Sequence, residues 1–174
     1  AVNQPSISEF RSEGDRHTAT VHFTTDGTYQ LSTNYTDLAS NVASSYEGEQ
    51  FVIDLIEPKI EIQGIKDQSA YKDELKPVIT FTDKNYDTSL VSLTVTGSNN
   101  GSMSLDRLNA VKSVIDNGEQ YVIEFPKNSS IDDLYTLTAT ISDKAGNETP
   151  VTRKVSCDST APTISFSRPY SYSV

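Results

Sequence analysis

The chain contains one passage twice, about one hundred residues apart. Residues 29–41 read YQLSTNYTDLASN and residues 135–147 read YTLTATISDKAGN, at a constant offset of 106 positions. Each copy is followed by the pattern Asp-x-x-x-Pro-x-Ile, which begins at Asp54 and again at Asp158, an offset of 104 positions. A repeat of this length has the size of a small domain rather than of a solenoid unit. The sequence therefore predicts similar modules arranged in tandem.

The composition favours an all-β fold. Ser and Thr are abundant, Trp is absent, and hydrophobic residues make up 35% of the chain. Thr suits strands, and both Ser and Thr suit turns. The low hydrophobic fraction still suffices for a sandwich, because only every second strand residue must be apolar.

The second module, between about residues 58 and 158, is predicted to be complete. Its strands are predicted at residues 59–62, 77–82, 90–96, 114–115, 120–125, 134–142 and 150–157. Residues 116–118, Asp-Asn-Gly, predict a hairpin with a primed turn. Alternation is clearest in residues 134–142, where one face carries Tyr135, Leu137, Ala139 and Ile141. About seven strands in about 100 residues are typical of an immunoglobulin-like sandwich.

Residues 103–114 fit this scheme least well. Their apolar positions Leu105, Leu108 and Val111 recur with a helix-like step, but the run spans barely three turns. A short helix and an irregular edge strand are both consistent with this segment.

Two tyrosines support the same fold independently. Tyr135 follows Asp-Asp-Leu and precedes x-Leu137, while Tyr29 follows Asp-Gly-Thr and precedes x-Leu31. In an immunoglobulin fold, a tyrosine at the entry to the sixth strand bonds through its hydroxyl to the backbone a few residues upstream. Tyr29 and Tyr135 are therefore predicted to be structural corner residues.

Together, the Tyr-x-Leu strand, the Asp-Lys-Ala-Gly-Asn turn and the Asp-Ser-Thr-Ala-Pro-x-Ile boundary resemble bacterial immunoglobulin-like (Ig-like) repeats. The resemblance implies antiparallel β-sandwich modules in tandem, in a protein that is secreted or attached to the cell wall or cell surface. It implies a non-catalytic, extracellular, semi-rigid spacer or stalk. One alternative is an adhesin module that binds a host protein or glycan through residues 97–114 and 129–133. Another is an accessory module of a secreted glycan-degrading enzyme.

The repeat also predicts the domain boundaries. Residues 1–55 are expected to be the C-terminal part of an incomplete module, residues 56–160 a complete module, and residues 161–174 a linker with the first strand of a following module. Partners are then the neighbouring Ig-like modules of a longer array. The incomplete module is expected to contain only three strands, between about residues 18 and 54, and the following module begins with a strand predicted at residues 163–166. Because three strands cannot enclose a core, we also expect that this chain could form a strand-exchanged homodimer through residues 161–174.

The repeated turn and connector residues are predicted to have structural roles. Asp and Asn side chains bond to backbone amides two residues on, and Gly or Asn tolerates positive φ. Pro restricts its own φ and the conformation of the residue before it. The residues assigned to these roles are Asp37, Asn41, Asp143, Gly146, Asn147, Pro58 and Pro162. Ser40 stands where the second copy has Gly146, so the two copies differ at this position of the turn.

A calcium site is the one cofactor that the residues suggest. Residues 83–87 begin like a calcium loop, with Asp83, Asn85 and Asp87 at alternate positions. The loop lacks the Gly and Glu that an EF-hand requires, so that class of site is excluded. A looser site with Asp132 or Asp133 as a further ligand remains as an alternative to turn-forming roles, and otherwise no cofactor is expected.

Charge and residue content exclude several functions. The net charge of −10 opposes nucleic-acid binding, and no apolar run is long enough to insert into a membrane in this segment. Cys157 is the single cysteine, and its only candidate histidine partners, His17 and His22, lie in the first copy. Cys157 is therefore predicted to be a buried apolar residue rather than a nucleophile.

Overall fold

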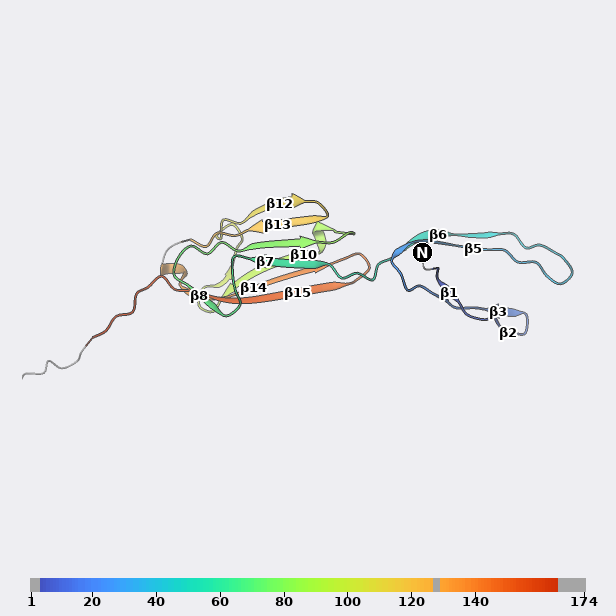
Figure 1. Ribbon diagram of the computed structural model, residues 1–174, viewed down its shortest axis with the longest axis horizontal. Helices are drawn as coiled ribbons and strands as arrows, with labels where there is room; N and C mark the ends of the chain where they lie inside the picture. Colours follow the sequence, from blue (N-terminus) through green and yellow to red (C-terminus); the bar gives the residue numbers. More distant parts are fainter. Residues whose placement is uncertain (1–3, 127–128, 166–174) are drawn as a thin grey trace, which may run out of the picture. The chain divides into compact units, whose positions relative to one another are not determined.

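The computed structural model describes residues 4–126 and 129–165 and divides into two compact units (Figure 1). Unit 1 comprises Ala1–Glu57 with Ala145–Asn147, and unit 2 comprises Pro58–Lys144 with Glu148–Val174. Among the described residues, no helix has the length and apolar character needed to cross a bilayer.

Unit 2 consists of two β-sheets (Figure 1). The first sheet is antiparallel and has the order β12 (Val111–Ile115), β13 (Gly118–Val122), β9 (Val78–Thr82) and β7 (Lys59–Gln63). The second has the order β11 (Gly101–Met103), β10 (Val91–Gly97), β14 (Asp133–Ser142), β15 (Glu148–Cys157) and β8 (Ser69–Tyr71), with only β8 running parallel to its neighbour. Two single 3₁₀ turns, η1 (Thr88–Leu90) and η2 (Ser129–Ile131), precede β10 and β14. This strand order is that of an immunoglobulin fold, which confirms the predicted fold class.

The core of unit 2 lies between the two sheets. In β14 every second residue is buried, which is the alternation expected from the sequence. The largest fully buried apolar side chains come from both sheets and from the loops between them: Leu75, Ile79, Phe81, Val95, Leu108, Ile123, Tyr135, Leu137 and Ile141. Both inner faces therefore contribute to one core.

The hairpin predicted around residue 117 is formed by β12 and β13. Ile115 pairs with Gly118, so Asp116 and Asn117 are the two turn residues, and Asn117 has a φ of 53°. A primed turn requires a positive φ at the first of the two turn residues, which Asp116 does not have, so the hairpin is confirmed but the predicted primed turn is wrong.

Of the segment 103–114, residues 111–114 lie in the edge strand β12, which is one of the two alternatives expected from the sequence, whereas residues 104–110 form neither a helix nor a strand. A hydrogen-bonded turn connects β11 to β12, with the Ala110 amide donating to the Leu105 carbonyl at 2.9 Å. Leu108 is fully buried and so fixes the turn to the core, while Asn109 has a φ of 45°, which ends the turn. The helix-like spacing of leucines reflects this buried anchor rather than a helix.

Unit 1 is much more open than unit 2. Its main element is the pair β5 (Gly27–Thr33) and β6 (Tyr46–Ile53), joined antiparallel with a bulge between Gln30 and Ser32. Beyond the three strands expected from the sequence, it also has β1 (Ser6–Ile7) paired with β4 (Val21–His22), and the hairpin of β2 (Arg11–Glu13) with β3 (Arg16–Thr18). No residue among the described positions 4–57 is fully buried.

The strand predicted at residues 163–166 is not seen in its described part. Residues 161–165 have no assigned strand, and Ile164 is 86% exposed. Phe166 and the residues after it lie outside the described part of the chain. The strand-exchanged homodimer therefore stays a prediction.

Candidate functional site

Both units contain a tyrosine that bonds to the backbone four residues upstream. The Tyr135 hydroxyl donates to the Ile131 carbonyl at 2.6 Å, and the Tyr29 hydroxyl donates to the Thr25 carbonyl at 2.8 Å. Tyr135 is fully buried and contacts the edge of the Phe125 ring, with centroids 5.0 Å apart. The two corners thus have the same geometry, although the segments before them differ in sequence.

Replacing Tyr135 by phenylalanine should destabilise unit 2 by about 1–2 kcal/mol, because the Ile131 carbonyl loses its donor while the ring remains. Denaturant unfolding of the full chain would measure this change. Tyr29→Phe is the matched control, since it removes the same bond from unit 1 and should leave the unfolding of unit 2 unchanged. Equal effects of the two variants on unit 2 would contradict the corner role.

The Asp-x-x-x-Asn turn of the first copy is held by its own side chains. Asp37 accepts hydrogen bonds from the Ala39 amide at 2.9 Å and from the Asn41 amide at 2.8 Å, while the Asn41 side chain donates to the second carboxylate oxygen. The Asn41 side chain and amide hold the pKa of Asp37 below its ordinary value. Ser40 has a φ of 68° and Gly146 one of 93°, so both copies use the left-handed region at this position.

In unit 1, Asn147 of the second copy lies beside the connector that precedes β7. Asp143 is buried, and the Asn147 side chain donates to the Asp54 carbonyl at 3.1 Å. In unit 2, the Thr149 hydroxyl donates to the Pro58 carbonyl at 2.6 Å. Pro162 lies in the described segment 161–165, which has no regular secondary structure.

Asp133 joins the two loops that the sequence analysis assigned to ligand binding. Its carboxylate accepts from the backbone amides of Asn99 and Asn100, each at 2.8 Å, and from both of their side chains. Burial alone would raise the pKa of Asp133, but the amides of Asn100, Asn99 and Leu134 outweigh it and hold the pKa below its ordinary value. Residues 97–114 and 129–133 therefore meet, with Asp133 committed to internal hydrogen bonds.

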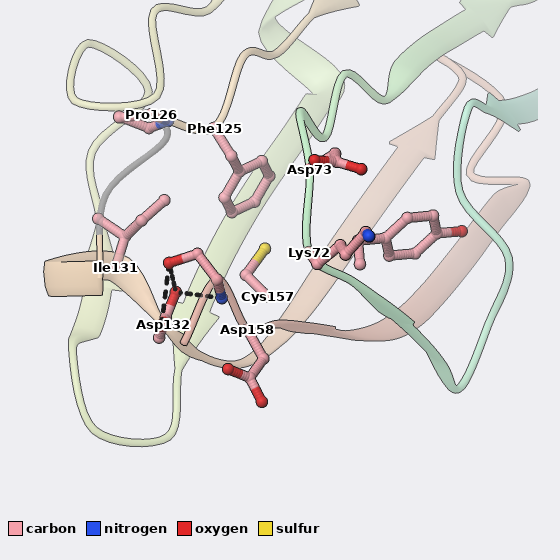
Figure 2. Close-up of a pocket in the computed structure, with 10 residues that line it drawn as sticks. Lys72, Asp73, Phe125, Pro126, Ile131, Asp132, Cys157 and Asp158 are labelled. Carbon is pink, nitrogen blue, oxygen red and sulfur yellow. Dashed lines mark hydrogen bonds between the residues drawn. The ribbon is translucent and has the colours of Figure 1, made fainter. Parts of the chain in front are cut away.

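Asp132, the neighbouring acid, faces the chain that leaves unit 2 (Figure 2). Its carboxylate accepts from the Ser159 amide at 3.0 Å, the Ser159 hydroxyl at 2.9 Å and the Thr160 hydroxyl at 2.7 Å. The hydrogen bonds from Thr160 and Ser159 hold the pKa of Asp132 below its ordinary value. Asp132 and Asp133 thus have separate partners.

The proposed combination of calcium ligands is not assembled. A carboxylate oxygen of Asp83 lies within 4.8 Å of one of Asp143, at the end of β14, whereas Asp133 begins that ten-residue strand. At about 3.3 Å per residue the two ends are about 30 Å apart. The suggestion that Asp132 or Asp133 completes a site with Asp83 is therefore wrong.

The other calcium candidates form local turns. Asp83 accepts from the Asn85 amide at 2.7 Å. Asp87 caps η1 by accepting from the Ser89 amide at 3.0 Å and the Ser89 hydroxyl at 2.8 Å. These are the turn-forming roles that the sequence offered as the alternative to metal binding.

Unit 2 contains a charged cluster around the buried Glu119 that the sequence pattern did not predict. The Glu119 side chain is fully buried, and its Oε2 accepts from Lys112 Nζ at 2.5 Å, from the Thr88 hydroxyl at 2.8 Å and from the Tyr86 hydroxyl. Burial alone would raise the pKa of Glu119, but these partners outweigh it and hold the pKa below its ordinary value. The one sequence feature that pointed to this cluster was Glu119 itself, a charged residue directly between the predicted hairpin turn and the strand predicted at residues 120–125.

Cys157 has the environment expected of a buried apolar residue. It is 8% exposed at the end of β15, and burial raises the pKa of its thiol to about 11. Both histidines belong to unit 1 and Cys157 to unit 2. The thiol is therefore uncharged at neutral pH and a poor nucleophile.

A family comparison agrees with this geometry. The model of the bacterial Ig-like domain matches residues 59–159, which include both sheets of unit 2, the tyrosine corner and the Asp132–Ser159 contact. No curated protein matches the chain. The family match covers more than half of the sequence, and the chain therefore belongs to the bacterial Ig-like domain family.

Proposed function

We propose that this chain is a non-catalytic segment of an extracellular bacterial surface protein, in which the modules serve as a semi-rigid spacer. Bacterial Ig-like domains commonly occur in extracellular or surface proteins and are generally non-catalytic. The carboxylates that the sequence suggested as calcium ligands form hydrogen bonds within the fold. Asp87, Asp132 and Asp133 all accept hydrogen bonds from turns and loops.

The observation that carries the proposal is the short, hydrogen-bonded connector between the modules. β6 ends at Ile53 and β7 begins at Lys59, so the connector is residues 54–58. The Ile56 amide donates to the Asp54 side chain at 3.1 Å, and the Pro58 carbonyl accepts from Thr149 at 2.6 Å. A connector that is short, ends in proline and uses its polar groups internally leaves little conformational freedom.

Inserting Gly-Ser-Gly-Ser after Pro58 should broaden the distribution of interdomain arrangements, because flexible residues replace a restricted connection. Small-angle scattering of the full chain would show this as an increase in the radius of gyration and in its spread. The same insertion between Gly14 and Asp15, in the exposed turn between β2 and β3 of unit 1, is the control and should leave the distribution unchanged. Equal scattering from the parent and the connector insertion would contradict a semi-rigid spacer.

The adhesin and accessory-module functions are the rival proposals. Residues 97–114 and 129–133 meet through Asp133, which gives a ligand a continuous loop surface. The sequence that flanks this segment in its parent protein distinguishes the rivals. A wall-sorting signal favours a stalk or adhesin, and a catalytic domain favours the accessory role. Calcium binding by residues 83–87 also stays a proposal, and a calcium titration without heat or a melting shift would remove it.

A further inference from the structure

The contact between Asp132 and the outgoing chain occurs in both units. In unit 1, Asp26 Oδ1 accepts from the Leu55 amide at 2.9 Å, and in unit 2, Asp132 Oδ1 accepts from the Ser159 amide at 3.0 Å. Asp132 follows Asp26 by 106 residues and Ser159 follows Leu55 by 104, which are the two offsets of the sequence repeat. The same bond therefore forms at equivalent positions in two modules.

The next residues of the connector also repeat. The Ile56 amide donates to Asp54 Oδ1 at 3.1 Å, and the Thr160 amide donates to Asp158 Oδ1 at 3.0 Å. Each connector thus begins with an aspartate that folds the chain back on itself, and its second residue is held by an aspartate of the module it leaves.

The donors in these bonds are backbone amides, so the arrangement does not depend on connector side chains. The first connector continues Leu-Ile-Glu-Pro and the second Ser-Thr-Ala-Pro. Ser159 and Thr160 add hydroxyl donors to Asp132 that Leu55 and Ile56 cannot supply to Asp26. The hydrogen bond from the backbone amide to the aspartate is the contact that both connectors have, although their side chains differ.

Each of the two aspartates directly follows the residue whose carbonyl accepts the hydrogen bond of the tyrosine corner. Tyr29 bonds to the carbonyl of Thr25, the residue before Asp26, and Tyr135 bonds to the carbonyl of Ile131, the residue before Asp132. The ring of Tyr135 is buried in the sandwich. A path of adjacent contacts thus runs from the ring, through the corner backbone, to the aspartate and the connector amide.

We propose that Asp26 and Asp132 are positioning residues that fix the direction in which the chain leaves each module, by binding the second residue of the connector. This inference rests on the proposed spacer function and assigns its stiffness to the module that precedes each connector. The proline at the end of each connector then restricts the backbone conformation of the remaining connector residues, which the aspartate does not bind.

The test compares Asp26→Ala and Asp132→Ala in the full chain with two readouts. The first is amide hydrogen exchange of Leu55 and Ser159. The second is the distance distribution between spin labels on Glu47→Cys in unit 1 and Ser92→Cys in unit 2, in a Cys157→Ala background. Asp26→Ala should speed exchange of the Leu55 amide roughly fivefold to tenfold and broaden the distribution, since the connector loses its first hold. Asp132→Ala should speed exchange only at Ser159 and leave the distribution unchanged, so each variant is the other's control.

Asp26→Asn keeps an oxygen acceptor and should restore slow exchange and the narrow distribution, which distinguishes loss of the bond from misfolding of unit 1. Unchanged exchange of Leu55 in Asp26→Ala would overturn the inference. It would be overturned equally by faster exchange with an unchanged distribution. A distribution that is already broad in the unsubstituted, labelled chain contradicts the spacer function itself, and this failure appears before either aspartate is changed.

Discussion

Replacing Gly118 with alanine is expected to destabilise unit 2 by about 3 kcal/mol. Gly118 pairs with Thr82 where β13 meets β9, directly after the hairpin turn. A Cβ at this position would overlap the Phe81 carbonyl oxygen and lie 3.1 Å from the Thr82 Cα. The obstruction is backbone, so relief requires β9 and β13 to separate rather than a side chain to rotate.

Thermal unfolding of the full chain would measure this loss as a fall of roughly 10–20 °C in the Tm of unit 2. Gly101→Ala is the matched control. Gly101 has a φ of 67° but no atom within 4 Å of the added methyl, so only the backbone strain of about 1 kcal/mol remains. Similar losses in the two variants would show that β9 and β13 are not held as closely as described.

Glu119→Gln should have the second largest effect, about 2–3 kcal/mol at neutral pH. The substitution keeps the size of the side chain but removes the charge that faces Lys112, and it gives the Tyr86 and Thr88 hydroxyls a weaker acceptor. Loss of one member of a fully buried ion pair costs more than this, but the Lys112 side chain is 41% exposed, so water compensates in part. Urea unfolding of parent and variant at pH 7 would give the difference.

The pH dependence follows from the direction of the shift. Because the pKa of Glu119 is lower in the folded chain than its ordinary value of 4.5, ionised Glu119 stabilises the fold. That stability is fully present above the ordinary pKa and is lost as the pH falls through the lower folded value. The stability difference between parent and Glu119→Gln should therefore shrink as the pH falls below about 4.5.

Glu61→Gln is the control for this variant. Glu61 lies 2.6 Å from Lys59, but both side chains are well exposed, at 47% and 68%. Exposed pairs of this kind contribute between about 0 and 1 kcal/mol. If Glu119→Gln and Glu61→Gln were equally mild at pH 7, the buried cluster would have no special weight in the stability of unit 2.

The fold was predictable where sequence patterns are local. Alternation in β14 depends on successive residues alone, and the turn at Asp116 and Asn117 depends on residues that tolerate a two-residue hairpin. The repeat added the position of Tyr135, because a second copy at Tyr29 gave the same residue in the same context. These features needed no knowledge of which strands meet.

The remaining features depend on contacts between segments that lie far apart in the chain. Which face of β13 points inward is set by its register against β9, and only that register places Glu119 beside Phe81 in the core. The partners that Asp26 and Asp132 have in common lie 29 and 27 residues further on and are backbone amides, which leave no mark in the sequence. Leu108 has a helix-like spacing from Leu105 and Val111 in the sequence, but its burial comes from the sandwich around it and not from a helix.

The most direct test of the spacer function is the distance distribution between units 1 and 2 in the Cys157→Ala background, measured by double electron–electron resonance with labels on Glu47→Cys and Ser92→Cys. A semi-rigid connector predicts one narrow population that does not change with protein concentration. A broad distribution, of the width expected for a five-residue flexible linker, would contradict the account.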